Sequence, residues 1–493
     1  MRKVGFTWLQ DKLNIREYHL THESYIGTTD RHELSSTGSV IRTFKSKYDV
    51  RDDNIMSHIE FALKYDDLNL GFLYEVFISI EHQEITDYIN LNPNRKYPRI
   101  IGYLYEFTVG RSIDVKVTTT NYEDILDPSK YITGSARKIS KWKVNDNLLG
   151  TVEFCPIIRR TTELNELINW NIEEALEALK QEYSSEVFKR ASYYFYKKET
   201  KSSSEIENED PPLDRLEKFI AILEQAGQKS FEETLSEREL VRIQNTIVDP
   251  RYADSGYRNF QNYVGQTMRD YSQKIHYVCP PPQFVKSLMK GIVNLNKKNI
   301  STKTIIKAAM VSFAFVYIHP FEDGNGRIHR FLIHDILVRD GAIPKSTVLP
   351  VSAQILANID EYDKTLESLS KIIERKVQYE LNNTGKLKVL NPLQIEKLYR
   401  FPDFTSHTVF LAKAIQTTVN KDIPEELLFL KCYDELKNEI QSIVDMPDFK
   451  IDRMIIFLHQ NKGKLASRKR KFFPELSDSE IEQMEEAYVS VFE

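Results

Sequence analysis

Cysteine is scarce in this sequence, and so is any excess of positive charge. The three cysteines, Cys155, Cys279 and Cys432, lie far apart in the 493 residues. That spacing excludes a disulfide framework and a zinc site built from clustered cysteines, and it fits a reducing compartment. Lys and Arg number 67 against 72 Asp and Glu, which gives a net charge of −5. We therefore do not expect a general nucleic-acid-binding protein.

Long hydrophobic runs are also absent. The longest nearly uncharged apolar run, 306–318, contains Lys307 and is too short to span a bilayer. The first twenty residues hold no apolar stretch of signal-peptide length. We therefore expect a cytoplasmic protein with no membrane segment.

The apolar content is ample for more than one core, since 41% of the residues are hydrophobic and 28% are charged. The length suggests about three domains. Changes in composition place them at 1–170, which mixes helix and strand, at 171–375, and at 376–493, which is helical and charged. The sequence as a whole is therefore predicted to be mainly α.

Apolar spacing predicts the elements of the first domain. It is helical over 55–65 and 70–80, and it alternates as in a strand over 112–119 and 149–158. The segment 97–107 stays undecided, because Pro98 and Gly102 interrupt its helical pattern.

The rest of the chain is predicted to be mostly helical. Helical spacing covers 164–198, the polar composition of 200–212 indicates a loop, and 260–279 has the pattern of a hairpin stopped by three prolines. Nearly every position of 302–318 is apolar, so this helix should be buried. Near the end, a turn is expected at 445–448, and a last helix capped by Ser477 or Asp478.

The segment HPFEDGNGRIHR, residues 319–330, joins that buried helix to a second helix. Gly324-Asn325-Gly326 frees the backbone to turn sharply, so that successive N–H groups can point at one anion at a helix start. Arg327 and Arg330 are three residues apart and share one helix face. Two guanidinium groups beside such a nest make a phosphate-binding site.

Two further residues of this segment suggest chemistry rather than binding alone. Asp323 is a poor partner for bare phosphate, but it could hold Mg²⁺ that bridges phosphate oxygens. His319 is the nearby group that can take a proton at neutral pH. Spacing alone also allows a plain helix–helix turn with no such role.

The same segment resembles the signature of the Fic family, His-Pro-Phe-x-Asp/Glu-Gly-Asn-Gly-Arg-x-x-Arg, and every fixed position matches. Members of that family are mostly adenylyltransferases, which move AMP from ATP to a hydroxyl of a target protein and release pyrophosphate. The resemblance implies a helical Fic core with a β-hairpin flap, flanked here by a mixed N-terminal domain and a helical C-terminal domain. It covers about residues 185–370.

The resemblance also assigns roles to single residues. It makes His319 the base for the target hydroxyl and Asp323 the ligand of Mg²⁺ on the α- and β-phosphates. It makes Phe321 an inward core anchor. The residues implied to bind the phosphates of ATP are Gly324, Asn325 and Gly326 as the anion hole, with Arg327 and with Arg330 on the γ-phosphate.

Two neighbouring segments extend the resemblance. The hairpin 262–279 is similar to the Fic flap, which docks an extended segment of the target by strand pairing. Tyr362, in Tyr-Asp-Lys-Thr-Leu, resembles a family tyrosine that lies near the nucleotide base. An ordinary surface hairpin and a core tyrosine are the alternatives.

The polar stretch contains a segment, 203–208, that resembles the inhibitory motif Ser/Thr-x-x-x-Glu-Gly/Asn of the family. The resemblance implies that Glu207 pairs with Arg330, which takes away the partner of the γ-phosphate. ATP could then bind with its α-phosphate misplaced for attack. A disordered polar linker is the alternative.

The predicted function is therefore Mg²⁺-ATP-dependent AMP transfer to a target protein, or to the chain itself, restrained by Glu207. The alternatives are a non-catalytic regulator that binds a partner or DNA, another nucleotide or phosphocholine donor, and removal of AMP. Self-association is left open. Three other features are given no functional role: His19 and His22 are not taken as a metal site, His329 is expected to be exposed, and the basic run 468–471 is taken as a solvated turn.

Overall fold

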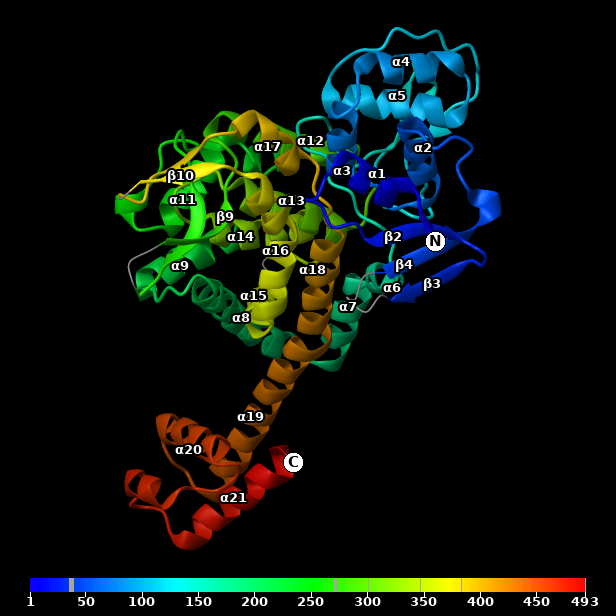
Figure 1. The fold of residues 1–493 in the computed structure, drawn as a ribbon. Coiled ribbons are helices and arrows are strands. Elements are labelled where there is room, and N and C mark those ends of the chain that lie inside the picture. Colours follow the sequence, from blue (N-terminus) through cyan, green and yellow to red (C-terminus); the bar gives the residue numbers. More distant parts are fainter. Residues whose placement is uncertain (35–39, 270–272, 300, 346, 383, 493) are drawn as a thin grey trace.

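The computed structural model describes residues 1–34, 40–269, 273–299, 301–345, 347–382 and 384–492. Its helices form one large body, with the N-terminal part at one side and the C-terminal helices carried away from it on a long rod (Figure 1). The prediction of a mainly α protein with small sheets is confirmed. Among the described residues, no helix has both the length and the apolar character that a membrane crossing needs.

The N-terminal part combines helices with two small sheets. Its strands pair in the orders β1-β2-β4-β3 and β5-β7-β6. The predicted helices at 55–65 and 70–80 are confirmed as α2 and α3. The elements are β1 (Arg2–Lys3), α1 (Gly5–Leu13), β2 (His22–Gly27), β3 (Arg31–Leu34), β4 (Val40–Lys45), α2 (Ile55–Tyr65), α3 (Leu70–Ile78), α4 (His82–Leu91), α5 (Lys96–Val109), β5 (Glu123–Asp124), β6 (Arg137–Ile139) and β7 (Val144–Asp146).

The undecided segment 97–107 is helical and forms most of α5. Pro98 is the third residue of this helix, where its missing N–H would have had no intrahelical partner. Gly102 faces Trp142, and a Cβ at Gly102 would overlap the indole ring. Pro98 is therefore compatible with the first turn of the helix, and Gly102 allows the close contact with Trp142.

The strand predicted at 112–119 is wrong, because the structure has no regular element there. Its backbone N–H groups bond to side chains instead of to a neighbouring strand. The N–H of Ile113 donates to Glu106, and those of Thr118 and Thr119 donate to Asn94. The alternating pattern therefore belongs to an extended segment held by side chains.

The strand predicted at 149–158 is also wrong, since only isolated bridges occur there among the described residues. The N–H groups of Cys155 and Ile157 donate to the carbonyls of Arg400 and Pro402. This apolar segment is thus buried against a distant part of the chain without joining a sheet.

The central part is a helical bundle with one hairpin. The predicted hairpin is confirmed as antiparallel β8 and β9, with a bulge between Val264 and Gly265. The elements are α6 (Thr162–Asn169), α7 (Ile172–Glu182), α8 (Ser185–Ile206), α9 (Leu213–Leu223), α10 (Phe231–Thr234), α11 (Glu237–Ile247), β8 (Tyr263–Thr267), β9 (Gln273–Val278), α12 (Pro282–Lys298), α13 (Thr304–Ile318), α14 (Asn325–Arg339), α15 (Val351–Ala357) and α16 (Ile359–Lys376).

The loop predicted at 200–212 is wrong in its first half, because α8 continues to Ile206. Four polar residues of this stretch, Thr200 and Ser202 to Ser204, are buried. The hydroxyls of Thr200 and Ser204 donate to carbonyls one turn earlier, and buried Glu199 accepts from the N–H and hydroxyl of Ser352. Composition suggested a loop because it cannot show which polar side chains have buried partners.

The C-terminal part is helical, as predicted, but it also contains a short hairpin that the sequence pattern did not indicate. Ser477 caps the last helix by accepting from the N–H of Glu480, as expected. The elements are β10 (Tyr379–Leu381), β11 (Leu387–Val389), α17 (Pro392–Arg400), α18 (Thr405–Thr417), α19 (Ile423–Ile443), α20 (Asp448–Gln460) and α21 (Asp478–Phe492).

The hydrophobic core is continuous from Phe6 to Leu427, and a second core spans Leu436 to Tyr488. The predicted buried helix is confirmed as α13, which lies against α12, α14 and α18 at the centre of the larger core. The helix α19 leads from this body to the second core, which it forms with α20 and α21 (Figure 1). The boundaries at 170 and 375 stay predictions.

Candidate functional site

The candidate site is the turn between α13 and α14. His319 ends α13 in the left-handed region (φ 51°, ψ 60°), and Gly324 precedes α14 with a φ of 85°. A side chain other than His, Asn or Asp is rarely found in the first conformation, and glycine suits the second. A Cβ at Gly324 would also press on Val248. The turn thus needs the residue types that the motif supplies.

Asn325 holds this turn from inside. Its side-chain oxygen accepts from the N–H of Phe321 at 3.1 Å, and its side-chain nitrogen donates to the carbonyl of Phe321 at 3.0 Å. Phe321 is fully buried, which confirms its prediction as a core anchor. Because the amide of Asn325 is engaged in this way, and the N–H of Gly324 already donates to Asp323, the backbone N–H groups of Asn325 and Gly326 are the ones left to bind an anion.

The start of α14 is suited to an anion. Gly324 is its N-cap and brings no side chain to cap the first turn, so N–H groups of that turn stay available. A Cβ at Gly326 would overlap the carboxylate of Glu207. A carboxylate thus lies over this helix start, where an anion is stabilised.

The imidazole of His319 lies beside this helix start. Its Nδ1 is 3.1 Å from the carbonyl of Val316, and since a carbonyl only accepts, Nδ1 carries the hydrogen and Nε2 is left as the basic nitrogen. Burial lowers the pKa of His319 to about 4. The ring is therefore neutral at pH 7 and able to accept a proton.

Arg330 is buried and held by the end of α8. Its Nε donates to the hydroxyl of Ser203 at 2.6 Å, and Nη2 donates to the carbonyl of Ser203 at 2.9 Å and to Glu207 Oε1 at 2.7 Å. Burial alone would raise the pKa of Glu207, but the Arg330 guanidinium holds that pKa below its ordinary value. The structure thus brings together Glu207 and Arg330, as the resemblance implied.

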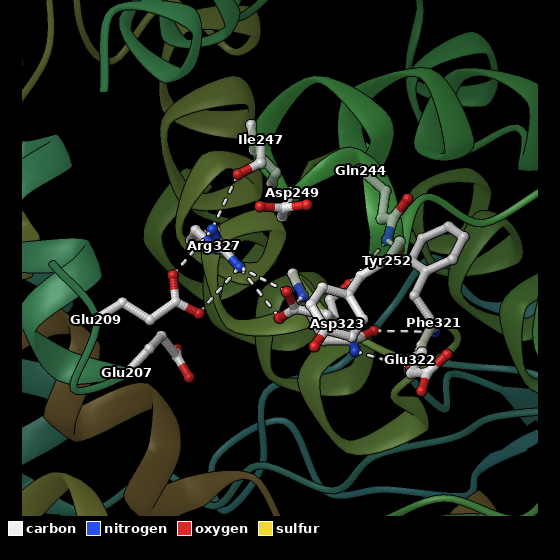
Figure 2. Close-up of polar contacts among 12 residues, drawn as sticks. Glu207, Glu209, Gln244, Ile247, Asp249, Tyr252, Phe321, Glu322, Asp323 and Arg327 are labelled. Carbon is white, nitrogen blue, oxygen red and sulfur yellow. Dashed lines mark hydrogen bonds and ion pairs between the residues drawn. The ribbon is translucent and has the colours of Figure 1, made fainter. Parts of the chain in front are cut away.

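Arg327 is the centre of a second set of contacts (Figure 2). Its Nη1 donates to the carbonyl of Ile247 at 2.9 Å and lies 3.1 Å from Glu209 Oε2. Its Nη2 is 3.1 Å from Asp323 Oδ1 and 3.3 Å from Glu209 Oε1. Burial raises the pKa of Glu209, and Arg327 opposes that rise. The sequence analysis missed Glu209, although its position two residues after Glu207 was a signal.

Asp323 is the carboxylate at the fixed acidic position of the motif. It accepts from the N–H of Gly324 and from Arg327, and its side chain is 37% exposed. A partly exposed carboxylate is the donor that Mg²⁺ prefers, with phosphate oxygens and water completing its shell. In the described part of the chain, no group of three or more His, Cys, Asp or Glu residues could hold a metal. A single carboxylate such as Asp323 fits Mg²⁺ that is bound together with a phosphate.

Tyr362 lies behind the turn on α16. It is buried against Phe313, His329 and Phe410, with ring centroids 5.6 to 6.4 Å away. Burial raises the pKa of Tyr362, and Arg330 is near enough to oppose that rise. The prediction that His329 is exposed is wrong, because α14 turns this unfixed motif position into the core, where the side chain is 0% exposed.

The hairpin β8–β9 is joined to the turn by hydrogen bonds. The hydroxyl of Tyr277 donates to the carbonyl of Tyr317 at 2.6 Å, and Asn262 donates to the carbonyl of Phe321 at 3.2 Å. Most residues of β8 are exposed. An exposed strand beside the turn leaves an edge to which another extended segment could pair.

Comparisons with known proteins agree with this site. A family model described as Fic/DOC family matches residues 234–337. A Fido domain-containing protein of Dictyostelium discoideum is 35% identical over 126 residues, which are 25% of this chain and 76% of that protein. A probable protein adenylyltransferase of Aquifex aeolicus is 30% identical over 168 residues, 30% of this chain and 50% of that protein.

The protein adenylyltransferase fic-1 of Caenorhabditis elegans is 32% identical over 130 residues, 24% of this chain and 23% of that protein. The chain thus spans half or less of the length of these two adenylyltransferases. The matched region of the Fido domain-containing protein covers most of that relative. Together with the motif at the α13–α14 turn, these matches show that the chain belongs to the Fic/DOC family.

Proposed function

We propose that this chain is a protein adenylyltransferase, which transfers AMP from ATP to a hydroxyl side chain of a target protein and releases pyrophosphate. The names of the relatives support the class of reaction. One observation carries the proposal: a neutral imidazole lies beside a helix start that carries two buried arginines. Such a constellation can bind a polyphosphate and take a proton next to it.

In this proposal His319 is the general base. Its Nε2 takes the proton of the target hydroxyl while the hydroxyl oxygen attacks the α-phosphorus of ATP. A new oxygen–phosphorus bond forms, the bond to the bridging oxygen breaks, and pyrophosphate leaves. The hydrogen bond from Nδ1 to Val316 fixes the ring so that Nε2 keeps its direction. Most of the rate gain would come from this positioning and from charge neutralisation.

The phosphates would lie on the first turn of α14. Its N–H groups would bind phosphate oxygens, and Arg327 and Arg330 would neutralise their charge. Asp323 would hold Mg²⁺, which would neutralise negative charge on the phosphates. Tyr362 would lie near the base, and the target would pair with the flap at 262–279.

Inhibition by Glu207 is part of the same proposal. Glu207 occupies Nη2 of Arg330 at 2.7 Å, and its negative charge lies where the γ-phosphate would bind. Glu209 would act in the same way on Arg327. Each arginine of the motif is thus matched by one carboxylate from the segment after α8. Removal of either carboxylate should raise activity.

The test is to incubate wild type, Glu207→Gly and His319→Ala/Glu207→Gly with ATP labelled on the α-phosphate, Mg²⁺ and a cell lysate. The proposal predicts labelled protein with Glu207→Gly, less with wild type and none with the double variant. Label transferred from another nucleoside triphosphate or from a phosphocholine donor would show that the donor is not ATP. Release of AMP from labelled protein would show that the enzyme removes AMP instead of attaching it. Tight DNA binding without transfer would favour a regulator.

A further inference from the structure

A buried arginine outside the motif reaches the turn from the flap side. Arg258 lies between α11 and β8, and its side chain is 4% exposed. Within the described residues, the acceptors bonded to its guanidinium are all backbone carbonyls. A buried charge is costly unless its hydrogen-bonding capacity is used. A neutral apolar side chain at this position would therefore leave these carbonyls without their donor.

The acceptors of Arg258 come from two places. On the side of the turn, Nε donates to the carbonyl of His319 at 2.7 Å, Nη2 donates to that of Ile318 at 3.2 Å, and the backbone N–H donates to that of Pro320 at 2.8 Å. Three successive carbonyls at the end of α13 thus bind one residue. A cation there is also favoured by the negative end of the helix dipole.

The other acceptors belong to the base of the flap. Nη1 donates to the carbonyl of Phe260 at 2.9 Å, just before β8, and Nη2 donates to that of Pro280 at 2.6 Å, just after β9. Both ends of the hairpin are therefore fixed to the same guanidinium that binds His319. Asn262 and Tyr277 continue this pattern on either side, at the carbonyls of Phe321 and Tyr317.

The backbone at His319 needs such support. A non-glycine residue in the left-handed region is strained, and it keeps that conformation only where its surroundings over-determine it. The peptide groups on both sides of His319 are the ones that Arg258 binds. Their orientation sets the direction of the imidazole.

We propose that Arg258 is a positioning residue. It fixes the backbone at His319 and links the orientation of the imidazole to the position of the base of the flap. A target docked on the flap would then be held at a fixed position relative to the imidazole of His319. This inference rests on the proposed function. It adds to it a residue outside the motif, whose side chain bonds to both ends of the flap.

The test replaces Arg258 by Met and by Lys in the Glu207→Gly background. Lysine keeps the charge but lacks the fork of five donors, so it can serve only some of these carbonyls. We expect kcat to fall about 100-fold for Arg258→Met and about tenfold for Arg258→Lys, because a misplaced base costs rate rather than binding. The dissociation constant of ATP, measured by calorimetry, should change by less than about threefold. Arg238→Met, an exposed arginine on α11, is the matched control.

A second readout separates positioning from loss of fold. Besides burial, the charged groups that act on His319 are Arg258, which lowers the pKa of the ring, and Glu207 and Asp323, which raise it. Arg258→Met should therefore raise the pKa of His319, as followed by NMR titration of its ring, whereas Arg258→Lys should leave it near the wild-type value. Loss of the local fold would instead remove the burial that lowers this pKa, so the pKa of His319 would move toward that of an ordinary imidazole in both variants.

The outcomes are distinct. If Glu207→Gly itself transfers no AMP, the proposed function fails, and the titration still tests Arg258. If Glu207→Gly is active and Arg258→Met keeps kcat within about twofold, the inference is wrong. A parallel loss of ATP binding and kcat would also overturn it, since the whole site would then have collapsed. If Arg258→Met does not fold, Arg258→Lys decides through the same comparison of kcat with ATP affinity.

Discussion

The contact between Glu207 and Arg330 allows the most detailed prediction. Glu207→Gly removes the carboxylate that lies 2.7 Å from Nη2 of Arg330. It leaves the bonds from Arg330 to Ser203 in place, because they use the hydroxyl and the carbonyl of another residue. The change therefore opens the place proposed for the γ-phosphate without disturbing the arginine itself.

The size of the effect follows from the geometry. A hydrogen bond to a charged group contributes about 1.5–3 kcal/mol. Arg330 is buried, but the side chain of Glu207 is 37% exposed, so water screens the pair. We therefore take the lower end, about 1.5 kcal/mol, which corresponds to an increase in transfer rate of about tenfold.

The assay measures incorporation of labelled AMP into protein at saturating ATP. Glu205→Gly is the control, because Glu205 lies in the same last turn of α8 but pairs with Lys201 at the surface. We expect about tenfold more label for Glu207→Gly and no change for Glu205→Gly. The reasoning is refuted if the two variants behave alike, since a loosened helix end would then explain any gain, or if Glu207→Gly is no more active than wild type.

Three further predictions concern neighbouring groups. Glu209→Gln should raise the transfer rate about two- to fivefold in the same assay, because an ion pair with one partly exposed partner contributes about 0.5–1 kcal/mol; an unchanged rate would show that Glu209 takes no part in the inhibition. Because burial lowers the pKa of His319 to about 4, and the base works in its neutral form, the rate of Glu207→Gly should stay level from neutral pH down to about 5 and fall as the pH approaches that pKa. A rate already halved near pH 6.5 would show an imidazole with an ordinary pKa. Asn325→Ala removes both hydrogen bonds to Phe321 and should lower the free energy of unfolding by about 2 kcal/mol, as measured by urea denaturation; a loss below about 0.5 kcal/mol would contradict its role in holding the turn.

The part of the site that lies within one stretch of sequence could be predicted. The turn at 319–324 follows from local rules, because the buried helix before it, the glycine that ends it and the helix after it all leave their pattern in the sequence. Arg327 and Arg330 share a face because of helical periodicity alone. The contact between Glu207 and Arg330 was reached through a family resemblance and not from local pattern.

The parts that depend on packing between distant segments could not be predicted. Glu209 meets Arg327 only because the segment after α8 lies beside α14 (Figure 2). The place of Arg258 depends on how the flap meets the end of α13. His329 was expected at the surface, but Phe313 on α13 and Tyr362 on α16 pack against it. Residues 112–119 alternate like a strand and yet find side-chain partners instead of a sheet.

The central claim is that the α13–α14 turn holds a nucleotide while His319 takes a proton from a target hydroxyl. Mass spectrometry of proteins from a lysate incubated with Glu207→Gly, ATP and Mg²⁺ tests it most directly. The account predicts AMP on a serine, threonine or tyrosine, and its complete loss in His319→Ala/Glu207→Gly although that variant still binds ATP. Undiminished AMP on the same residue with the double variant would contradict it.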